Sequence, residues 1–230
     1  MEKSIKIVKN HFSENSYIKE MHDRNKFGLK NWEKEVVEKY FNINKGKILN
    51  IGCGPGREAI SLAKIGFDVV GTDISEKEID IAKEESIKQN LNIEFKLCDG
   101  INLNFDNKYF NYSIIWAQTM GNIYLKKNRI KILKENKRIL KDDGILCFST
   151  HDYEFIKTNY KKYTKGSKFF PYKESKCYWK LFTLDEIKEM VKNVEFEIIF
   201  CGKASELIDI DDTNVLICIC KNGSTAHNKR

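Results

Sequence analysis

The 230-residue chain is predicted to form an α/β fold: a doubly wound sheet of seven mostly parallel strands, with an antiparallel last strand and helices on both faces. Three observations predict this class. Short apolar runs alternate with segments whose apolar residues recur at helical spacing. A glycine-rich stretch follows the first apolar run, and the second and third runs each lead into an aspartate.

The elements are expected in the following order. The apolar stripe of Trp32, Val36, Val37, Tyr40 and Phe41 indicates a helix before the first strand. Strands are predicted at 47–51, 67–72, 92–98, 109–116, 145–150, 195–201 and 213–220, with the last two forming an antiparallel hairpin. Helices are predicted from residue 56, over 75–90, around 132–140 and from 183, with Ser75/Glu78 and Thr183/Glu186 as capping boxes.

Residues 47–75, KILNIGCGPGREAISLAKIGFDVVGTDIS, join a buried strand, a tight turn, a helix and a second strand. Glycines at 52, 54 and 56 allow positive φ angles and a close approach of backbone N–H groups to a ligand. Asp73 lies twenty-one positions after Gly52, which matches the offset of about 20 for an acid that binds ribose hydroxyls. The unit is therefore expected to bind an adenosine-containing cofactor.

A nicotinamide or flavin site is the competing interpretation. Its fingerprint needs a third glycine where the helix packs on the strand, and this chain has Arg57 there. The sequence GCGPG, together with Asp73 and the strand and helix around it, resembles motif I of the class I S-adenosylmethionine-dependent methyltransferases. The resemblance extends over roughly residues 30 to 220 and implies a Rossmann-like fold.

The resemblance implies a role for each site residue. Asp73, with Ile74 beside it, would bind the ribose; Asp99 would bind the adenine edge, and Gly100 and Ile101 its ring face. Residues 49–56 would line the methionine part, and the loop after the fourth strand would lie near the methyl group. The expected cofactor-binding residues are Asn50, Gly52, Cys53, Gly54, Gly56, Asp73, Ile74, Asp99, Gly100, Ile101, Ala117 and Gln118.

Some features keep a second interpretation. Asp73 and Asp99 are also suited to capping a helix or a turn. Asn50 and Asn111 replace aspartates that are common in the family, so the alternatives for the ammonium group of the cofactor are binding by backbone carbonyls instead of Asn50, or weaker binding.

His151 is the candidate catalytic base, because it directly follows the fifth strand at the ligand edge and imidazole titrates near neutrality. The pair His151–Asp152 is equally consistent with turn and capping chemistry. The chain lacks paired CxxC motifs and clustered Cys and His residues, so no metal site is expected.

Residues 152–182 form a connection longer than is usual and hold ten aromatic residues and eight lysines against three acids. We expect a cover over the acceptor pocket, with a strand around 176–182 that has one apolar face. Stacking of RNA bases and a satellite core under a long loop are the alternatives.

Composition limits the remaining choices. The net charge of +7 comes mostly from lysine, with five arginines among forty basic residues, which favours a solvated surface over a nucleic-acid site. Seven cysteines, an odd number, lie mostly in apolar strands and indicate a reducing, cytoplasmic environment. The sequence shows no membrane span or secretory signal.

The sequence therefore predicts a methyltransferase domain over 1–221, with a candidate N-terminal lid at 1–29 and a disordered tail at 222–230. The expected reaction is methyl transfer from S-adenosylmethionine to a nitrogen or oxygen of a small-molecule metabolite. An RNA or protein methyltransferase and a noncatalytic cofactor-binding module are the alternatives. A motif for methylating exocyclic base amines is absent after the fourth strand.

Overall fold

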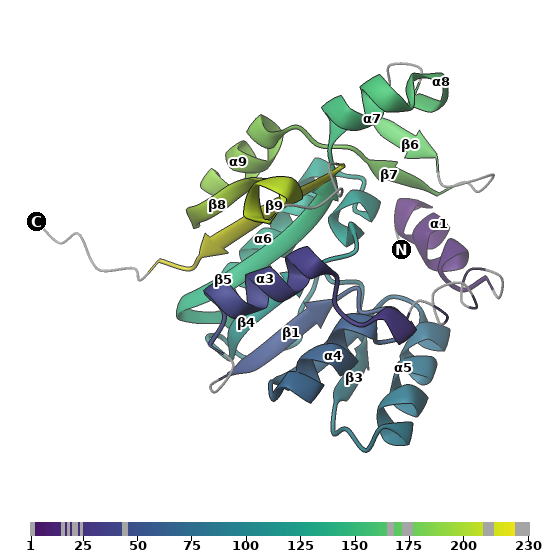
Figure 1. Ribbon diagram of the computed structural model, residues 1–230, viewed down its shortest axis with the longest axis vertical. Coiled ribbons are helices and arrows are strands. Elements are labelled where there is room, and N and C mark those ends of the chain that lie inside the picture. The colour runs from purple at the N-terminus through teal and green to yellow at the C-terminus, as the bar shows by residue number, and fades with distance from the viewer. Residues whose placement is uncertain are drawn as a thin grey trace, which may run out of the picture.

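A seven-stranded sheet occupies the middle of the molecule (Figure 1). The computed structural model describes residues 3–14, 17, 19, 23, 25–42, 46–164, 168–171, 177–208 and 214–223. The strands of this sheet are β1 (Lys47–Ile51), β2 (Asp68–Asp73), β3 (Glu94–Leu97), β4 (Phe110–Ile115), β5 (Leu140–His151), β8 (Glu197–Lys203) and β9 (Val215–Lys221).

The strand order is β3-β2-β1-β4-β5-β9-β8. Neighbours from β3 to β5 pair in parallel, whereas β9 is antiparallel to both β5 and β8. The strand order reverses between β1 and β4, and ligands of such sheets bind outside the carboxyl ends of the strands at this point. The predicted fold class is confirmed, including the antiparallel arrangement of the last two strands.

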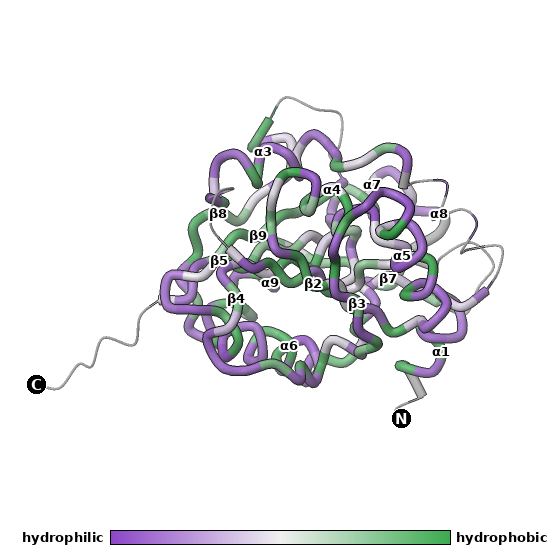
Figure 2. Tube along the Cα trace, turned by 90° about the horizontal axis from the view of Figure 1, so that it is seen from below, coloured by the Kyte–Doolittle hydropathy of each residue, from purple (hydrophilic) through white to green (hydrophobic). Residues whose placement is uncertain are grey.

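Helices cover both faces of the sheet. Buried side chains of α3 (Asn31–Tyr40), α4 (Arg57–Ile65), α5 (Glu76–Lys88) and α10 (Ala204–Leu207) belong to one hydrophobic core. Those of α6 (Lys126–Ile139) and α9 (Leu184–Lys192) belong to a second core on the opposite face. Figure 2 shows the consequence, since the central strands are mostly hydrophobic and the outer helices carry many hydrophilic residues.

The fifth strand starts earlier than predicted. The predicted helix around 132–140 and the predicted strand from 145 leave Asp142-Asp143-Gly144 as a turn between them. In the structure, β5 begins at Leu140, directly after α6. The pairing shifts between Phe110–Leu140 and Tyr112–Ile145, so residues 141–144 form a bulge. Asp143 has a φ of 64°, and a Cβ on Gly144 would lie 2.9 Å from the carbonyl oxygen of Lys141. The turn residues therefore serve a bulge within a strand.

Asn222 is ordered and buried, so the prediction of a disordered tail from residue 222 is wrong at that position. Its side-chain Nδ2 donates to the carbonyl oxygens of Lys137, Leu140 and Lys141 at 3.1, 3.0 and 3.1 Å. These bonds satisfy carbonyls at the end of α6 and at the bulge. Residues 224–230, the rest of the predicted tail, lie outside the described residues.

The connection between β5 and α9 forms a separate small layer near one end of the sheet (Figure 1). It contains α7 (Tyr153–Asn159), α8 (Lys161–Thr164) and the antiparallel pair β6 (Phe169–Pro171) and β7 (Tyr178–Lys180). The expected strand is present, and Cys177, Trp179 and Leu181 form its apolar side, which is buried at Cys177 and Leu181. On the other side Tyr178 is exposed, whereas Lys180 is buried with its ammonium group 3.2 Å from a carboxylate oxygen of Glu186.

Candidate active site

A cavity of about 740 Å³ lies at the carboxyl ends of β1, β2, β4 and β5. Its walls come from the glycine-rich turn after β1 (the motif turn, residues 52–56) and from the ends of these strands. Residues of the connection 152–182 (the cover) and of α1 (Lys3–His11), with the residues that follow α1, complete the walls. Ten of the twelve predicted cofactor-binding residues and His151 line it. The ten are Gly52, Cys53, Gly54, Asp73, Ile74, Asp99, Gly100, Ile101, Ala117 and Gln118.

Asn50 and Gly56 are not among the residues that line the cavity. Asn50 is buried within β1, and its Nδ2 has no hydrogen-bond partner among the described residues. Gly56 precedes α4 with a φ of 97°, and a Cβ there would lie 3.2 Å from Ile60 and 3.3 Å from the Cβ of Ala82. Gly56 therefore allows close packing of α4 on α5, which is a different role from the one predicted.

The motif turn forms part of the cavity wall. Gly52 has a φ of 73°, and a Cβ on it would lie only 2.5 Å from Cγ2 of Thr119 in the loop after β4. Any larger residue would push that loop away. Gly54 is the other turn glycine on the wall, and its N–H donates to Oδ2 of Asp73 at 2.9 Å. The turn and the acid at the end of β2 thus form one unit.

Asp73 serves the local structure and faces the cavity as well. Its Oδ1 accepts a hydrogen bond of 2.9 Å from the N–H of Ser75, in addition to the bond from Gly54. Burial raises the pKa of Asp73, and the backbone N–H donors of Ser75 and Gly54 oppose that rise. Each carboxylate oxygen keeps acceptor capacity after these bonds.

Because Asp73 takes the N–H of Ser75, the predicted capping box at Ser75 and Glu78 is only half formed. Ser75 Oγ accepts from the N–H of Glu78 at 3.4 Å, but the Glu78 carboxyl makes no return bond. The capping box at Thr183 and Glu186 is complete.

Asp99 also combines two roles. Its Oδ1 accepts from the N–H groups of Ile101 and Asn102 at 2.8 and 3.1 Å, which is the turn chemistry that the sequence left open. Gly100 has a φ of 73° in this turn, and Ile101 is buried against the cavity.

The loop after β4 has a strained backbone. Ala117 and Gln118 have φ angles of 48° and 59°, a region that non-glycine residues rarely occupy. The N–H of Gln118 is anchored to Ser149 Oγ at 3.3 Å. Strain of this kind persists where the surroundings fix it, and it concentrates at functional sites.

His151 lies at the end of β5 with its ring 4.9 Å from that of Trp179, edge to face. Its Nδ1 is buried and has no hydrogen-bond partner within the described part of the chain. Burial, with the nearby charge of Lys30, lowers the pKa of His151 to about 4. The imidazole is therefore neutral at physiological pH. Asp152 does not pair with it but caps α7, accepting from the N–H of Glu154 at 2.9 Å.

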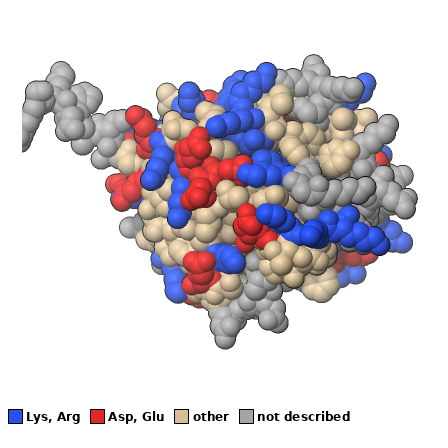
Figure 3. Space-filling model, turned by 90° about the horizontal axis from the view of Figure 1, so that it is seen from above, with Lys and Arg blue, Asp and Glu red and all other residues tan. Residues whose placement is uncertain are grey.

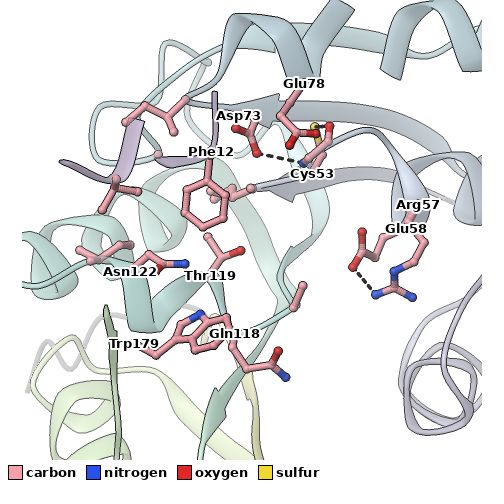
Figure 4. Close-up of a pocket in the computed structure, with 18 of the residues that line it drawn as sticks. Phe12, Cys53, Arg57, Glu58, Asp73, Glu78, Gln118, Thr119, Asn122 and Trp179 are labelled. Atoms are coloured by element: carbon pink, nitrogen blue, oxygen red, sulfur yellow. Dashed lines mark hydrogen bonds and ion pairs between the residues drawn. The ribbon is translucent and has the colours of Figure 1, made fainter. Parts of the chain in front are cut away.

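Figure 4 shows wall residues that the sequence did not single out as site residues. Phe12 points into the cavity between Asp73 and Thr119, while Arg57 and Glu58 lie to the other side of the motif turn. The spacing of Ile5, Val8 and Phe12 is the signal for α1, since these apolar residues recur along one helix face. Glu78 carried no such signal, because an acid in a first helical turn is ordinary.

The described residues contain no group of three or more His, Cys, Asp and Glu side chains placed to hold a metal ion. Among the same residues, no helix is both long and apolar enough to cross a membrane.

Comparison with known proteins agrees with this geometry. Residues 48–144 match the family described as "Methyltransferase domain". A probable S-adenosyl-L-methionine-dependent methyltransferase, TehB, of Haemophilus influenzae is 30% identical over 154 residues, which are 61% of this chain and 52% of the relative. A ubiquinone biosynthesis O-methyltransferase of Pelagibacter ubique is 30% identical over 158 residues, or 65% and 63% of the two chains. The chain thus spans between half and two thirds of these relatives.

The fold has a similar counterpart in the crystal structure of an S-adenosylmethionine-dependent methyltransferase from Methanosarcina mazei. The TM-score is 0.69 at 23% identity, and the match covers 84% of this chain and 98% of that one. Over the matched region the chain is thus similar to S-adenosylmethionine-dependent methyltransferases, and it shares the fold of the solved structure.

Proposed function

We propose that this protein transfers the methyl group of S-adenosylmethionine to a nitrogen or oxygen of a small-molecule metabolite. One observation carries the proposal: a single cavity extends from the motif turn to His151 and Trp179 under the cover. Such a space accommodates a cofactor and a compact acceptor together. The relative named as a ubiquinone biosynthesis O-methyltransferase supports the same class of acceptor.

The cavity wall fits the cofactor. Asp73 presents acceptor oxygens, Gly54 places backbone without a side chain at the wall, and Asp99 with Ile101 supplies a polar group and an apolar face. When bound, S-adenosylmethionine supplies an activated methyl group on a positively charged sulfur. The residues of the chain then have to bind, orient and exclude water, and correct positioning is a large part of such catalysis.

We assign His151 the role of orienting the acceptor. A neutral imidazole whose Nδ1 has no protein partner can accept a hydrogen bond from a hydroxyl or an uncharged amine. A hydroxyl oxygen becomes far more acidic once a methyl group bonds to it, so even a weakly basic imidazole can take the proton that this oxygen must lose. Trp179 holds the ring from the cover side.

An RNA or protein acceptor is the second candidate. On the face drawn in Figure 3, basic side chains are interspersed with acidic ones. Several lysines form ion pairs, including Lys126 with Glu189 at 3.1 Å and Lys168 with Glu186 at 3.0 Å. This mixture favours a solvated surface over a phosphate-binding track.

The seven free thiols favour the cytoplasm as the location.

The test is transfer of radiolabelled methyl groups from S-adenosylmethionine into a cell extract separated into metabolite, RNA and protein fractions. Label in the metabolite fraction supports the proposal, and label in RNA or protein supports the second candidate. Cofactor binding in calorimetry without label in any fraction would indicate a noncatalytic binding module. Calorimetry with NAD, for which no binding is expected, is the control for the cofactor.

A further inference from the structure

Glu78 is a buried acid in the cavity wall. It lies in the first turn of α5, is 1% exposed, and neither carboxyl oxygen has a hydrogen-bond partner among the described residues. Figure 4 shows its side chain descending from α5 toward the motif turn, beside Cys53 and near Asp73. A Cβ built on Gly54 would be 3.7 Å from Glu78 Oε2.

A buried carboxyl without a partner is costly for a fold. Leaving such a group unsatisfied destabilises the folded state, whereas a methionine or leucine of similar size would fill the same space without that cost. The cost is understandable if the missing partner is a ligand, because Glu78 lies on the wall of the cavity that holds the cofactor-binding motif.

The charges around Glu78 are mostly negative. Asp73 at the end of β2 is its charged neighbour, and Cys53 lies between these acids and Glu58 of α4. Lys77, on the same turn, donates to the carbonyl oxygen of Ser13 at 3.1 Å, and Glu14, which follows α1, lies 3.9 Å from Nδ1 of His11. Burial, and secondly the charge of Asp73, raises the pKa of Glu78 to about 8. The free protein therefore holds this carboxyl protonated at neutral pH.

We propose that Glu78 is a second carboxyl at the ribose of the cofactor, where it hydrogen-bonds the ribose beside Asp73. Glu78 loses its proton to solvent when the positively charged S-adenosylmethionine enters. The O–H bond of the carboxyl breaks, the electron pair stays on Glu78, and the carboxylate balances the charge of the sulfonium. The demethylated product has a neutral thioether and drives this ionisation less. Glu78 thus favours the charged cofactor over its product. The inference depends on the cofactor and is independent of the acceptor.

Calorimetry of the full chain at pH 7.2 tests this proposal. Titrations with S-adenosylmethionine in phosphate and in Tris, which differ in ionisation enthalpy, give the number of protons released. The wild-type protein should release a large fraction of one proton. Glu78→Gln should abolish this release and weaken S-adenosylmethionine binding about tenfold, with a smaller effect on the demethylated product.

Glu76→Gln is the matched control, because Glu76 lies in the same helical turn but is exposed. This variant should bind and release protons like the wild type. If Glu78→Gln does so too, the proposal is wrong. If that variant does not fold, infrared difference spectroscopy of the wild type replaces it: a protonated carboxyl band should disappear on cofactor binding, and persistence of the band would contradict the proposal. A wild type that binds no S-adenosylmethionine would overturn the cofactor assignment itself.

Discussion

His151 illustrates how burial changes the chemistry of a single residue. An exposed histidine would be partly charged at pH 6.5, whereas the lowered pKa of about 4 keeps this ring neutral in the free protein. A role as a strong base is thereby disfavoured, and a role in orienting the acceptor is favoured.

We expect His151→Ala to lower kcat by roughly 10- to 100-fold, because a positioned hydrogen bond and proton acceptor are lost. The affinity for S-adenosylmethionine should stay within about twofold, since the ring lies on the acceptor side. Steady-state kinetics and calorimetry measure the two quantities. The wild-type kcat should show no step between pH 6 and 8 caused by this residue; a step that vanishes in the variant would contradict the neutral assignment.

His151 and Glu78 make the stability of the free protein depend on pH in opposite directions. For His151 the unfolded chain binds more protons between pH 4 and 6.5, so stability decreases as pH falls through this range. For Glu78 the folded protein binds more protons between pH 4.5 and 8, so stability decreases as pH rises through this range. The second effect has an upper limit of about 5 kcal/mol, which partial access of water to the cavity reduces.

Glu78→Gln should therefore increase the free energy of unfolding at pH 8 by about 1 to 3 kcal/mol and leave it nearly unchanged at pH 4.5. Urea unfolding at several pH values measures this difference. Glu76→Gln should follow the wild-type curve, and an equally steep pH dependence in Glu78→Gln would show that another group is responsible.

At the scale of elements, a buried ion pair joins α3 to α4. Glu33 is fully buried and accepts from both Nη atoms of Arg57 at 2.7 Å, and from the N–H of Lys30 at 2.7 Å. Arg57 also donates to the carbonyl oxygen of Gly28 at 2.7 Å and to Glu58. The arginine that distinguishes this motif from a dinucleotide site thus fixes the chain before β1 against the motif helix.

Glu33→Gln should lower the free energy of unfolding by about 2 kcal/mol, which is less than for a pair that loses its only partner because Glu58 remains. Lys39→Ala is the control, since Lys39 is exposed and its pair with Glu35 should contribute little to stability. Denaturant unfolding compares them. Equal losses in both variants would show that burial of the Arg57 pair adds nothing.

The elements also show how far sequence reasoning extends. The strand positions and the motif turn were predictable, because apolar runs, glycines at 52 and 54 and the acid Asp73 each leave a local signal. The start of β5 was not, since Asp143-Gly144 signals a turn whether it ends a strand or forms a bulge within it. Asn222 and Lys180 were unpredictable because their partners are far along the chain or become available only after packing.

The candidate site shows the same division. Residues at strand ends were predicted to meet, and the cavity brings ten of the twelve together with His151. Asn50 and Gly56 do not line the cavity, because Asn50 is buried within β1 and Gly56 lies where α4 packs on α5, neither of which the sequence alone shows. Glu78 and Phe12 come from helix faces that become cavity walls only through tertiary packing.

For the whole molecule, ligand binding should be visible as stability. S-adenosylmethionine at 100 times its Kd should stabilise the folded state by about 2.7 kcal/mol and raise the Tm by roughly 5 to 10 °C. Thermal unfolding measures this shift. NAD should cause none, and Asp73→Asn should reduce the shift given by S-adenosylmethionine; an equal shift in that variant would remove Asp73 from the cofactor site.

The position of β9 has a consequence for biosynthesis. β9 is buried and lies between β5 and β8, and in the described sheet β8 pairs only with β9. When synthesis has reached the end of β8, all strands of the sheet except β9 have been made. At this stage β5 still exposes an unpaired edge and β8 has no neighbour. The ribosome covers the most recently made residues, so this sheet closes only after β9 has left the ribosome. Until then the open edge is a site for aggregation, and chaperones that shield it would be needed most in this interval.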